Sequence, residues 1–126
     1  MLFRSKMEEI LPPSSVKVLT DKNGDAIFFS RFAIPFRQNP VGDEDFLKNP
    51  FFGKHLGIYV YQKDFLLKYP SLEVPLIERC ESLEQLRALH HGIKIGMGKT
   101  GFGSQSVDTA EDLELARKAF REQSQS

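Results

Sequence analysis

The sequence predicts an α/β fold in which helices pack on a mixed β-sheet. Two observations carry this prediction: a hairpin of apolar strands near the start, and a second half whose segments alternate in the order strand, helix, strand, helix. A chain of 126 residues is long enough for one domain with a hydrophobic core. We divide it into a lead-in at 1–14, a single α/β domain at 15–122 and a disordered tail at 123–126.

Charge and cysteine content exclude several classes of function. Lys plus Arg and Asp plus Glu number 17 each, so no net field favours nucleic acid or an anionic membrane. The single cysteine, Cys80, has no partner for an internal disulfide, which is typical of a reducing compartment. No apolar run has the length of a signal peptide or a membrane span. The sequence therefore predicts a soluble, cytoplasmic protein.

The first predicted element is a β-hairpin. VKVLT at 16–20 alternates apolar and polar residues, DKNGD at 21–25 is a turn, and AIFFS at 26–30 is the returning strand. Prolines, glycines and charges at 31–54 keep no period, which indicates a long excursion with room for a short helix. Arg31, directly after the hairpin, either binds a carboxylate or phosphate through its guanidinium or is an ordinary charge at a strand end.

HLGIYVY at 55–61 has the strongest strand pattern in the chain. Its period of two predicts a core face made of Leu56, Ile58 and Val60. On the other face, Gly57 leaves room between His55 and Tyr59. Two interpretations of that face stand. A ligand lies there, or another element or subunit covers it and the two side chains are merely hydrogen-bonded.

Helices and one more strand complete the expected fold. KDFLLK forms a short helix that Pro70 stops, and a longer helix runs from Pro75 to Gly92, with Gly92 just after its C-cap. KIGMGK at 94–99 is the last strand. Residues 110–122 carry apolar side chains at helical spacing and form the last helix.

The long predicted helix carries two polar residues, Glu84 and Arg87, that point into its apolar stripe. The stripe consists of Leu76, Ile77, Cys80, Leu83 and Leu86. Glu84 and Arg87 either pair with each other at the edge of the core, or Glu84 is a carboxylate held at the wall of a pocket. Cys80, Glu84 and His91 cannot share one metal ion, because about 16 Å of helix separates the first from the last.

Two motifs near the C-terminus need interpretation. GMGKTG at 96–101 fits GxGxxG, but Ile93 stands where a P-loop requires glycine and FGSQSVD delays the next helix, so we expect only a flexible loop. Asp108 and Thr109 are both suitable N-caps of the last helix. With Thr109 as the cap, Asp112 completes a capping box and Asp108 is left as a loop carboxylate.

Four segments together resemble the C-terminal half of CMP-KDO synthetases, the 3-deoxy-manno-octulosonate (KDO) cytidylyltransferases. They are VKVLTDKNGDAIFFSRFAIPF, FGKHLGIYVYQKDFLLKYPSL, ESLEQLRALHHGIKI and SVDTAEDLELAR, in the family's order between residues 15 and 120. CMP-sialic acid synthetases are similar more distantly. The resemblance implies half of a Rossmann-like nucleotide-diphospho-sugar transferase fold in a cytoplasmic homodimer. Such enzymes couple CTP to KDO with Mg²⁺, giving CMP-KDO and pyrophosphate for lipopolysaccharide synthesis.

The resemblance also implies roles for individual residues. By position in the matching segments, the KDO pocket would be formed by Arg31, His55, Tyr59, Glu84 and Gln85. A guanidinium with several hydrogen-bonding groups suits a hydroxylated acid. Asp108 would bind Mg²⁺, which prefers carboxylate oxygens, and Thr109 would then be the N-cap. The chain departs from the family at Ala110, where proline is common.

Nothing in the sequence resembles the family's N-terminal half, which carries the nucleotide loop and a second acidic metal site. We therefore predict a C-terminal fragment or one half of a split enzyme, with a separate N-terminal half as its partner and little or no activity alone. The rival hypothesis is a non-catalytic module of the same origin, either self-associating or sugar-acid-binding. Its interface would be the excursion at 31–54 and the segment at 55–61.

Overall fold

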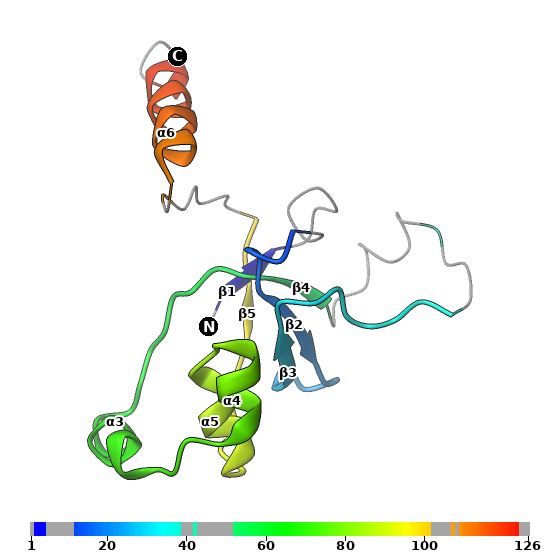
Figure 1. The fold of residues 1–126 in the computed structure, drawn as a ribbon, viewed down its shortest axis with the longest axis vertical. Helices are drawn as coiled ribbons and strands as arrows, with labels where there is room; N and C mark the ends of the chain where they lie inside the picture. Colours follow the sequence, from blue (N-terminus) through cyan, green and yellow to red (C-terminus); the bar gives the residue numbers. More distant parts are fainter. Residues whose placement is uncertain are drawn as a thin grey trace.

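The computed structural model describes residues 2–4, 12–38, 42, 52–101, 107 and 109–123. Among them, five strands form one sheet in the order β3-β2-β4-β1-β5 (Figure 1). The strands are β1 (Leu2–Arg4), β2 (Lys17–Thr20), β3 (Ala26–Ser30), β4 (Phe52–His55) and β5 (Gly98–Lys99). Neighbours are antiparallel except β1 and β5, which are parallel. The predicted α/β class with a mixed sheet is thus confirmed.

The predicted hairpin is present as β2 and β3, with Val18 opposite Phe29. Local chemistry explains its turn. The Asp21 carboxylate accepts the backbone N–H groups of Asn23 at 2.8 Å and of Asp25 at 3.0 Å. Gly24 has a φ of 85°, a left-handed conformation that glycine adopts without strain. The turn residues and the strand patterns therefore predict the same hairpin, and the structure confirms both strands.

The prediction for HLGIYVY is wrong beyond its first residue. β4 ends at His55, and Gly57, with a φ of 73°, turns the chain out of the extended path of the strand. Of the three residues predicted to be core, Ile58 is 50% exposed and Val60 90% exposed. An alternating pattern shows which side chains share a face, but it does not show whether the sheet continues beneath them.

Residues 56–74 form an arm that leaves the sheet after β4 and returns to the next helix (Figure 1). The arm carries α3 (Lys63–Lys68) followed by a single 3₁₀ turn, η1 (Tyr69–Ser71). Pro70 lies in this turn, so it ends the helix as predicted. Beyond the arm the chain comes back to pack against the hairpin.

The single helix predicted from Pro75 to Gly92 is in fact two, α4 (Leu76–Glu81) and α5 (Gln85–His90). The break is at Ser82, which has a φ of 51°, and the N–H of Leu83 bonds to the carbonyl of Glu78 at 3.3 Å. This closure resembles a Schellman motif, with serine in the place where glycine is usual. The expected end is confirmed, since Gly92 follows the C-cap with a φ of 73°.

The break changes which residues of the predicted stripe reach the core. Leu83 and Leu86 are buried against Val18 and Phe29 of the hairpin. The remaining members of the stripe are exposed, namely Leu76, Ile77 and Cys80. The alternative that paired Glu84 with Arg87 is also wrong, because Arg87 forms its ion pair with Glu78 at 2.6 Å. A periodic stripe assumes one straight helix, and the turn at 82–84 rotates the second half.

The last helix, α6 (Ala110–Gln123), stands apart from the sheet in Figure 1. Its predicted capping box is confirmed. The N–H of Asp112 donates to Thr109 Oγ1 at 3.1 Å, and the N–H of Thr109 donates to the Asp112 carboxylate at 3.0 Å. Asp108, the segment 102–106 and the tail at 124–126 lie outside the described residues, as does the excursion at 39–51 apart from residue 42.

The strand predicted at 94–99 is shorter than expected. Only Gly98 and Lys99 belong to β5, while Gly96 forms an isolated bridge with Asp25 of the hairpin turn. None of the helices in the described ranges combines the length and the apolar composition that a membrane span requires. The limits proposed for the lead-in, the domain and the tail stay a prediction.

Candidate functional site

A cavity of about 320 Å³ lies where the end of β4, the start of the arm and the turn between α4 and α5 meet. Four of the five residues predicted for the KDO pocket line it: His55, Tyr59, Glu84 and Gln85. We call it the His55–Gln85 cavity. Lys54 and Ser15 also line it, and no sequence pattern had singled them out. Residues from three separate segments of the chain thus converge on one space.

His55 is held at the end of β4 between two aromatic rings. Its ring meets Phe29 edge-on at 5.3 Å and Tyr59 edge-on at 5.2 Å. The residue is only 7% exposed, and its Nε2 atom has no hydrogen-bond partner among the described residues. Burial lowers the pKa of His55 to about 4, so the imidazole is neutral at pH 7. A neutral imidazole offers a ligand one donor and one acceptor rather than a charge.

Gln85 is the first residue of α5 and is 5% exposed. Its side-chain nitrogen, Nε2, is the second buried atom in the described part of the chain that lacks a hydrogen-bond partner. A buried polar group without a partner costs about 1–3 kcal/mol. The two residues that carry such nitrogens both line the cavity, and a polar ligand is the kind that such residues bind.

Tyr59 and Glu84 add a donor and an acceptor to the same cavity. Burial, assisted by neighbouring Tyr61 and Glu84, raises the pKa of Tyr59 to about 12. The phenol therefore keeps its proton at neutral pH. Glu84 is exposed and occupies the position just before α5. The set of imidazole, phenol, amide and carboxylate can hold several hydroxyl groups at once.

The structure places Arg31, the fifth predicted residue, at the end of β3 rather than among the residues that line the cavity. Its Nε donates to the carbonyl of Glu81 at 2.9 Å and its Nη2 reaches the carbonyl of Ser82 at 3.5 Å. These bonds cap the C-terminus of α4. Ser82 itself lines the cavity, so the guanidinium lies next to the cavity wall.

Lys17 supports this site and was missed by sequence reasoning. It is fully buried, and its ammonium donates to the carbonyls of Pro12 at 3.0 Å, of Ser15 at 2.6 Å and of Arg31. Burial lowers the pKa of Lys17, and the nearby Glu81 carboxylate opposes that shift. The alternating pattern of VKVLT predicts that this lysine faces solvent. In the structure the loop at 12–15 covers the side chain, and a sequence pattern does not show that contact.

The described residues do not by themselves form a metal site. In 12–38, 52–101 and the shorter described ranges, no three His, Cys, Asp or Glu residues lie close enough together to hold an ion. Asp108, the predicted Mg²⁺ ligand, lies outside the described residues. Its role stays a prediction.

Comparisons with known proteins agree on one family. A family model described as cytidylyltransferase matches residues 4–95. The 3-deoxy-manno-octulosonate cytidylyltransferase of Solibacter usitatus is 50% identical over 113 residues, which are 90% of this chain and 42% of that protein. The same enzyme from Thermodesulfovibrio yellowstonii is 46% identical over 115 residues, covering 91% of this chain and 45% of that protein.

A solved structure gives the same picture. The structure of CMP:2-keto-3-deoxy-manno-octonic acid synthetase in complex with CTP superposes with a TM-score of 0.83 at 34% identity, covering 97% of this chain and 48% of that one. The present chain spans less than half the length of these relatives.

Proposed function

This chain belongs to the cytidylyltransferase family, and we propose that it is the sugar-acid-binding part of a 3-deoxy-manno-octulosonate cytidylyltransferase. That enzyme transfers CMP from CTP to KDO and releases pyrophosphate, a step of lipopolysaccharide biosynthesis. The observation that carries the proposal is the cavity lined by His55, Gln85, Tyr59 and Glu84, in which His55 and Gln85 each have a buried nitrogen without a hydrogen-bond partner among the described residues. The names of the relatives support the choice of KDO and CTP as substrates.

In this proposal each side chain of the His55–Gln85 cavity has a defined partner on the sugar. The Gln85 amide and the Tyr59 phenol donate to oxygens of KDO, and the Glu84 carboxylate accepts from a hydroxyl group. The neutral His55 imidazole donates or accepts at a further hydroxyl. Arg31 directs two of its N–H groups at the carbonyls of Glu81 and Ser82, so guanidinium donors are left for the sugar carboxylate.

The chemistry proposed for the whole enzyme is an in-line displacement at phosphorus. A KDO hydroxyl oxygen forms the new bond to the α-phosphorus of CTP, the bond to the pyrophosphate oxygen breaks, and the hydroxyl proton is released. The residues of this chain orient the attacking sugar, because positioning of the two reactants supplies much of the rate. Mg²⁺, when bound, neutralises charge on the phosphates, and we propose Asp108 as one of its ligands.

The CTP site and the remaining metal ligands belong, in this proposal, to the part of the enzyme that corresponds to the N-terminal half of the relatives. We expect the chain alone to release no pyrophosphate from CTP and KDO, and the mixture of both halves to do so. The N-terminal half of the Solibacter usitatus relative is a suitable partner for the assay. Absence of turnover in the mixture, together with no heat of KDO binding by the chain in calorimetry, would overturn the proposal.

A pair of matched variants tests the cavity itself. Gln85→Ala removes the buried amide, and we expect it to weaken KDO binding at least tenfold, because the ligand loses a hydrogen-bond donor of the cavity wall. Gln62→Ala, on the exposed part of the arm, is the control and should bind KDO like the unchanged chain. Equal affinities for the two variants would exclude Gln85 from the binding site.

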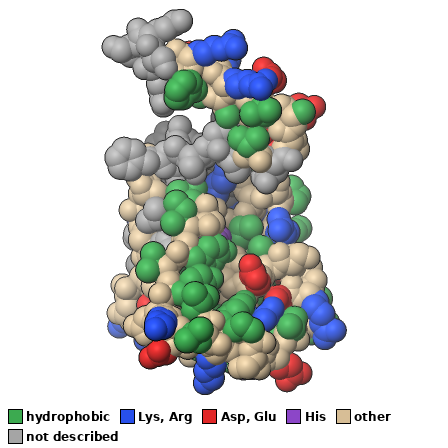
Figure 2. Space-filling model, turned by 90° about the vertical axis from the view of Figure 1, so that its left-hand side faces the viewer, with side chains coloured by type: hydrophobic (Ala, Val, Ile, Leu, Met, Phe, Trp, Pro, Cys, Tyr) green, Lys and Arg blue, Asp and Glu red, His purple; other side chains and the backbone are tan. Residues whose placement is uncertain are grey.

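A second candidate function is a self-associating module without catalysis, and one observation favours it. Large apolar side chains are exposed on the arm and on α6, among them Val60, Leu67 and Phe120. Figure 2, which looks at the side of the molecule where the arm lies, shows hydrophobic side chains gathered in a band over that face. Sedimentation separates the candidates: a stable oligomer that binds no KDO would favour the module.

A further inference from the structure

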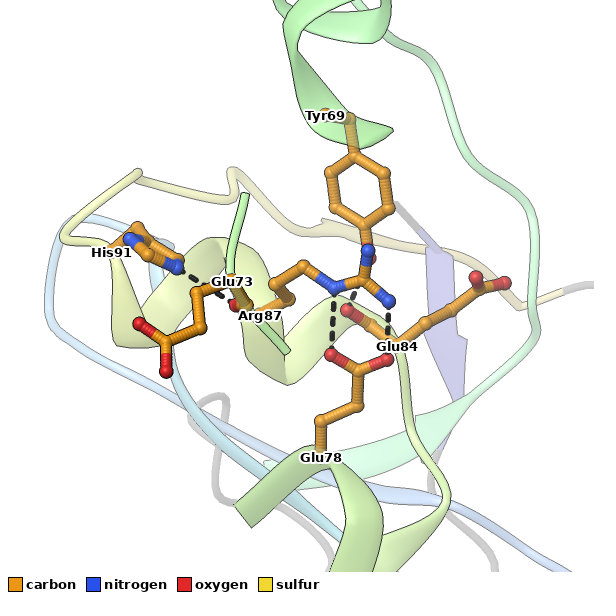
Figure 3. Close-up of polar contacts among 6 residues, drawn as sticks. All are labelled: Tyr69, Glu73, Glu78, Glu84, Arg87 and His91. Carbon is orange, nitrogen blue, oxygen red and sulfur yellow. Dashed lines mark hydrogen bonds and ion pairs between the residues drawn. The ribbon is translucent and has the colours of Figure 1, made fainter. Parts of the chain in front are cut away.

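Arg87 of α5 is fixed by a bidentate ion pair with Glu78 of α4. Its Nε and Nη2 donate to the two carboxylate oxygens at 2.7 and 2.6 Å, and the side chains of Arg87 and Glu78 are only 14% and 12% exposed (Figure 3). The pair holds the pKa of Glu78 below its ordinary value. Two parallel hydrogen bonds fix the plane of the guanidinium as well as its position.

Tyr69, from the 3₁₀ turn of the arm, lies against this guanidinium. The Arg87 Cζ atom is 4.7 Å from the centroid of the Tyr69 ring, a cation–π geometry. The Tyr69 hydroxyl donates to the main-chain carbonyl of Glu84 at 2.5 Å. That carbonyl belongs to the peptide group that joins Glu84 to Gln85. The ion pair therefore fixes the ring, and the ring fixes the peptide just before α5.

A second contact joins the arm to the other end of α5. The Nε2 of His91, the C-cap residue, donates to the carbonyl of Glu73 at 3.0 Å. The arm is thus attached at both ends of α5, at Glu84 and at His91. In Figure 3 the Glu84 carboxylate points away from the Arg87–Glu78 pair, so the network holds the main chain of Glu84 and leaves its side chain free to line the cavity.

We propose that Tyr69 and Arg87 are positioning residues, which act through the Glu84–Gln85 peptide to aim the buried Gln85 amide into the His55–Gln85 cavity. The ligand of that amide rests on the proposed function, whereas the positioning does not. Neither residue is among those that line the His55–Gln85 cavity, although Tyr69 lines a neighbouring cavity of about 310 Å³ together with Tyr59 and Gln85. A helix of six residues has few internal hydrogen bonds of its own, and its first residue depends on outside contacts for a fixed orientation.

The test uses a conservative variant and a matched control in the full chain. Tyr69→Phe keeps the ring beneath Arg87 and removes only the hydroxyl. Tyr61→Phe makes the same change in a tyrosine whose hydroxyl has no partner in the described part of the chain. Nitrogen NMR gives two signals: the backbone amide of Gln85 reports the bond to the Glu84 carbonyl, and the side-chain amide of Gln85 reports the positioning.

We expect Tyr69→Phe to shift both Gln85 signals and Tyr61→Phe to shift neither. A side-chain amide signal that stays in place in Tyr69→Phe would overturn the proposal, because the peptide would then move without moving the amide. Calorimetry with KDO adds a functional readout, with binding expected to be about fivefold weaker in Tyr69→Phe. If the unchanged chain binds no KDO and the mixture of both halves shows no turnover while the side-chain signal still shifts, the positioning is supported and the proposed function fails.

Arg87→Lys completes the test from the other side of the ring. Lysine keeps the charge beside Glu78 but loses the two parallel bonds and the planar stacking surface. We expect this variant to shift the side-chain amide of Gln85 in the same direction as Tyr69→Phe while the chain stays folded. An unshifted signal would remove Arg87 from the proposal.

Discussion

Arg31 donates two hydrogen bonds to Glu81, one from its main chain and one from its side chain. The backbone N–H of Arg31 donates to the Glu81 carboxylate at 2.9 Å, and the Arg31 side chain donates to the Glu81 carbonyl at 2.9 Å. The same carboxylate accepts the hydroxyl of Ser30 at 2.6 Å. The end of β3 is therefore attached to the end of α4, where the chain turns toward the His55–Gln85 cavity.

Removing the Glu81 side chain should destabilise this junction. In Glu81→Ala the Ser30 hydroxyl and the Arg31 N–H lose a charged acceptor, and we expect the free energy of unfolding to fall by about 2 kcal/mol. Urea titration measures the change. Glu73→Ala removes an exposed carboxylate and is the control, with a change close to zero. Equal effects of both substitutions would contradict the role of Glu81.

Replacing Lys17 should destabilise the fold more than replacing Glu81. The Lys17 ammonium is the shared donor for the carbonyls of Pro12, Ser15 and Arg31. Lys17→Met keeps most of the volume but leaves these acceptors without a partner. We expect the free energy of unfolding to fall by about 3 kcal/mol in urea titrations. Lys22→Met, in the exposed turn, should change it little. A Lys17→Met chain as stable as the original would show that water replaces the ammonium at no cost.

Because His55 is buried, the free energy of unfolding should depend on pH. The pKa of His55 is about 4 in the folded chain, whereas the ordinary value of 6.5 applies in the unfolded chain. Between these two pH values the unfolded chain therefore binds a proton that the folded chain does not bind. The free energy of unfolding should therefore fall as the pH decreases from 6.5 to about 4, by up to about 3 kcal/mol.

The variant that checks this origin is His55→Gln, in which the extra loss between pH 6.5 and 4 should disappear. Urea titrations at several pH values in this window measure the slope. His90→Gln changes an exposed histidine at the end of α5 and should keep the slope of the unchanged chain. If the slope survives in His55→Gln, another group carries the pH dependence.

Replacing Thr109 should lower the stability of α6 and leave the sheet unchanged. Thr109→Ala removes the oxygen that accepts the N–H of Asp112 at 3.1 Å, which typically costs about 1 kcal/mol of helix stability. Faster hydrogen exchange in the first turn of α6 is the expected result, with the strands unchanged because the helix stands apart from them (Figure 1). Lys118→Ala, in the exposed middle of α6, is the control. Faster exchange in β2 and β3 would show that α6 supports the sheet.

Elements that depend on neighbouring residues were predictable from the sequence. The hairpin follows from its turn, where the Asp21 carboxylate and Gly24 close the chain, and α6 begins with the expected pair of Thr109 and Asp112. The break at Ser82 was not predictable. It depends on the burial of Leu83 against the hairpin and on contacts with residues far away in the sequence.

In the candidate site, too, some residues were predictable from the sequence and the contacts that support them were not. The resemblance of four segments to a known family named the residues His55, Tyr59, Glu84 and Gln85, and the fold brings them to one cavity. The supporting contacts have no sequence pattern, because the Arg87–Glu78 pair crosses the break between two helices and the Tyr69 hydroxyl returns from the arm.

By itself, then, the sequence determined the family, the α/β class, the hairpin and four residues of the cavity, all of which rest on local pattern or on matching segments. Only the tertiary structure decided that the strand stops at His55, that the long helix divides, and that Lys17 is buried beneath carbonyls. The physical reason is that burial and hydrogen bonding between distant segments set these features, and a one-dimensional pattern does not contain the partner.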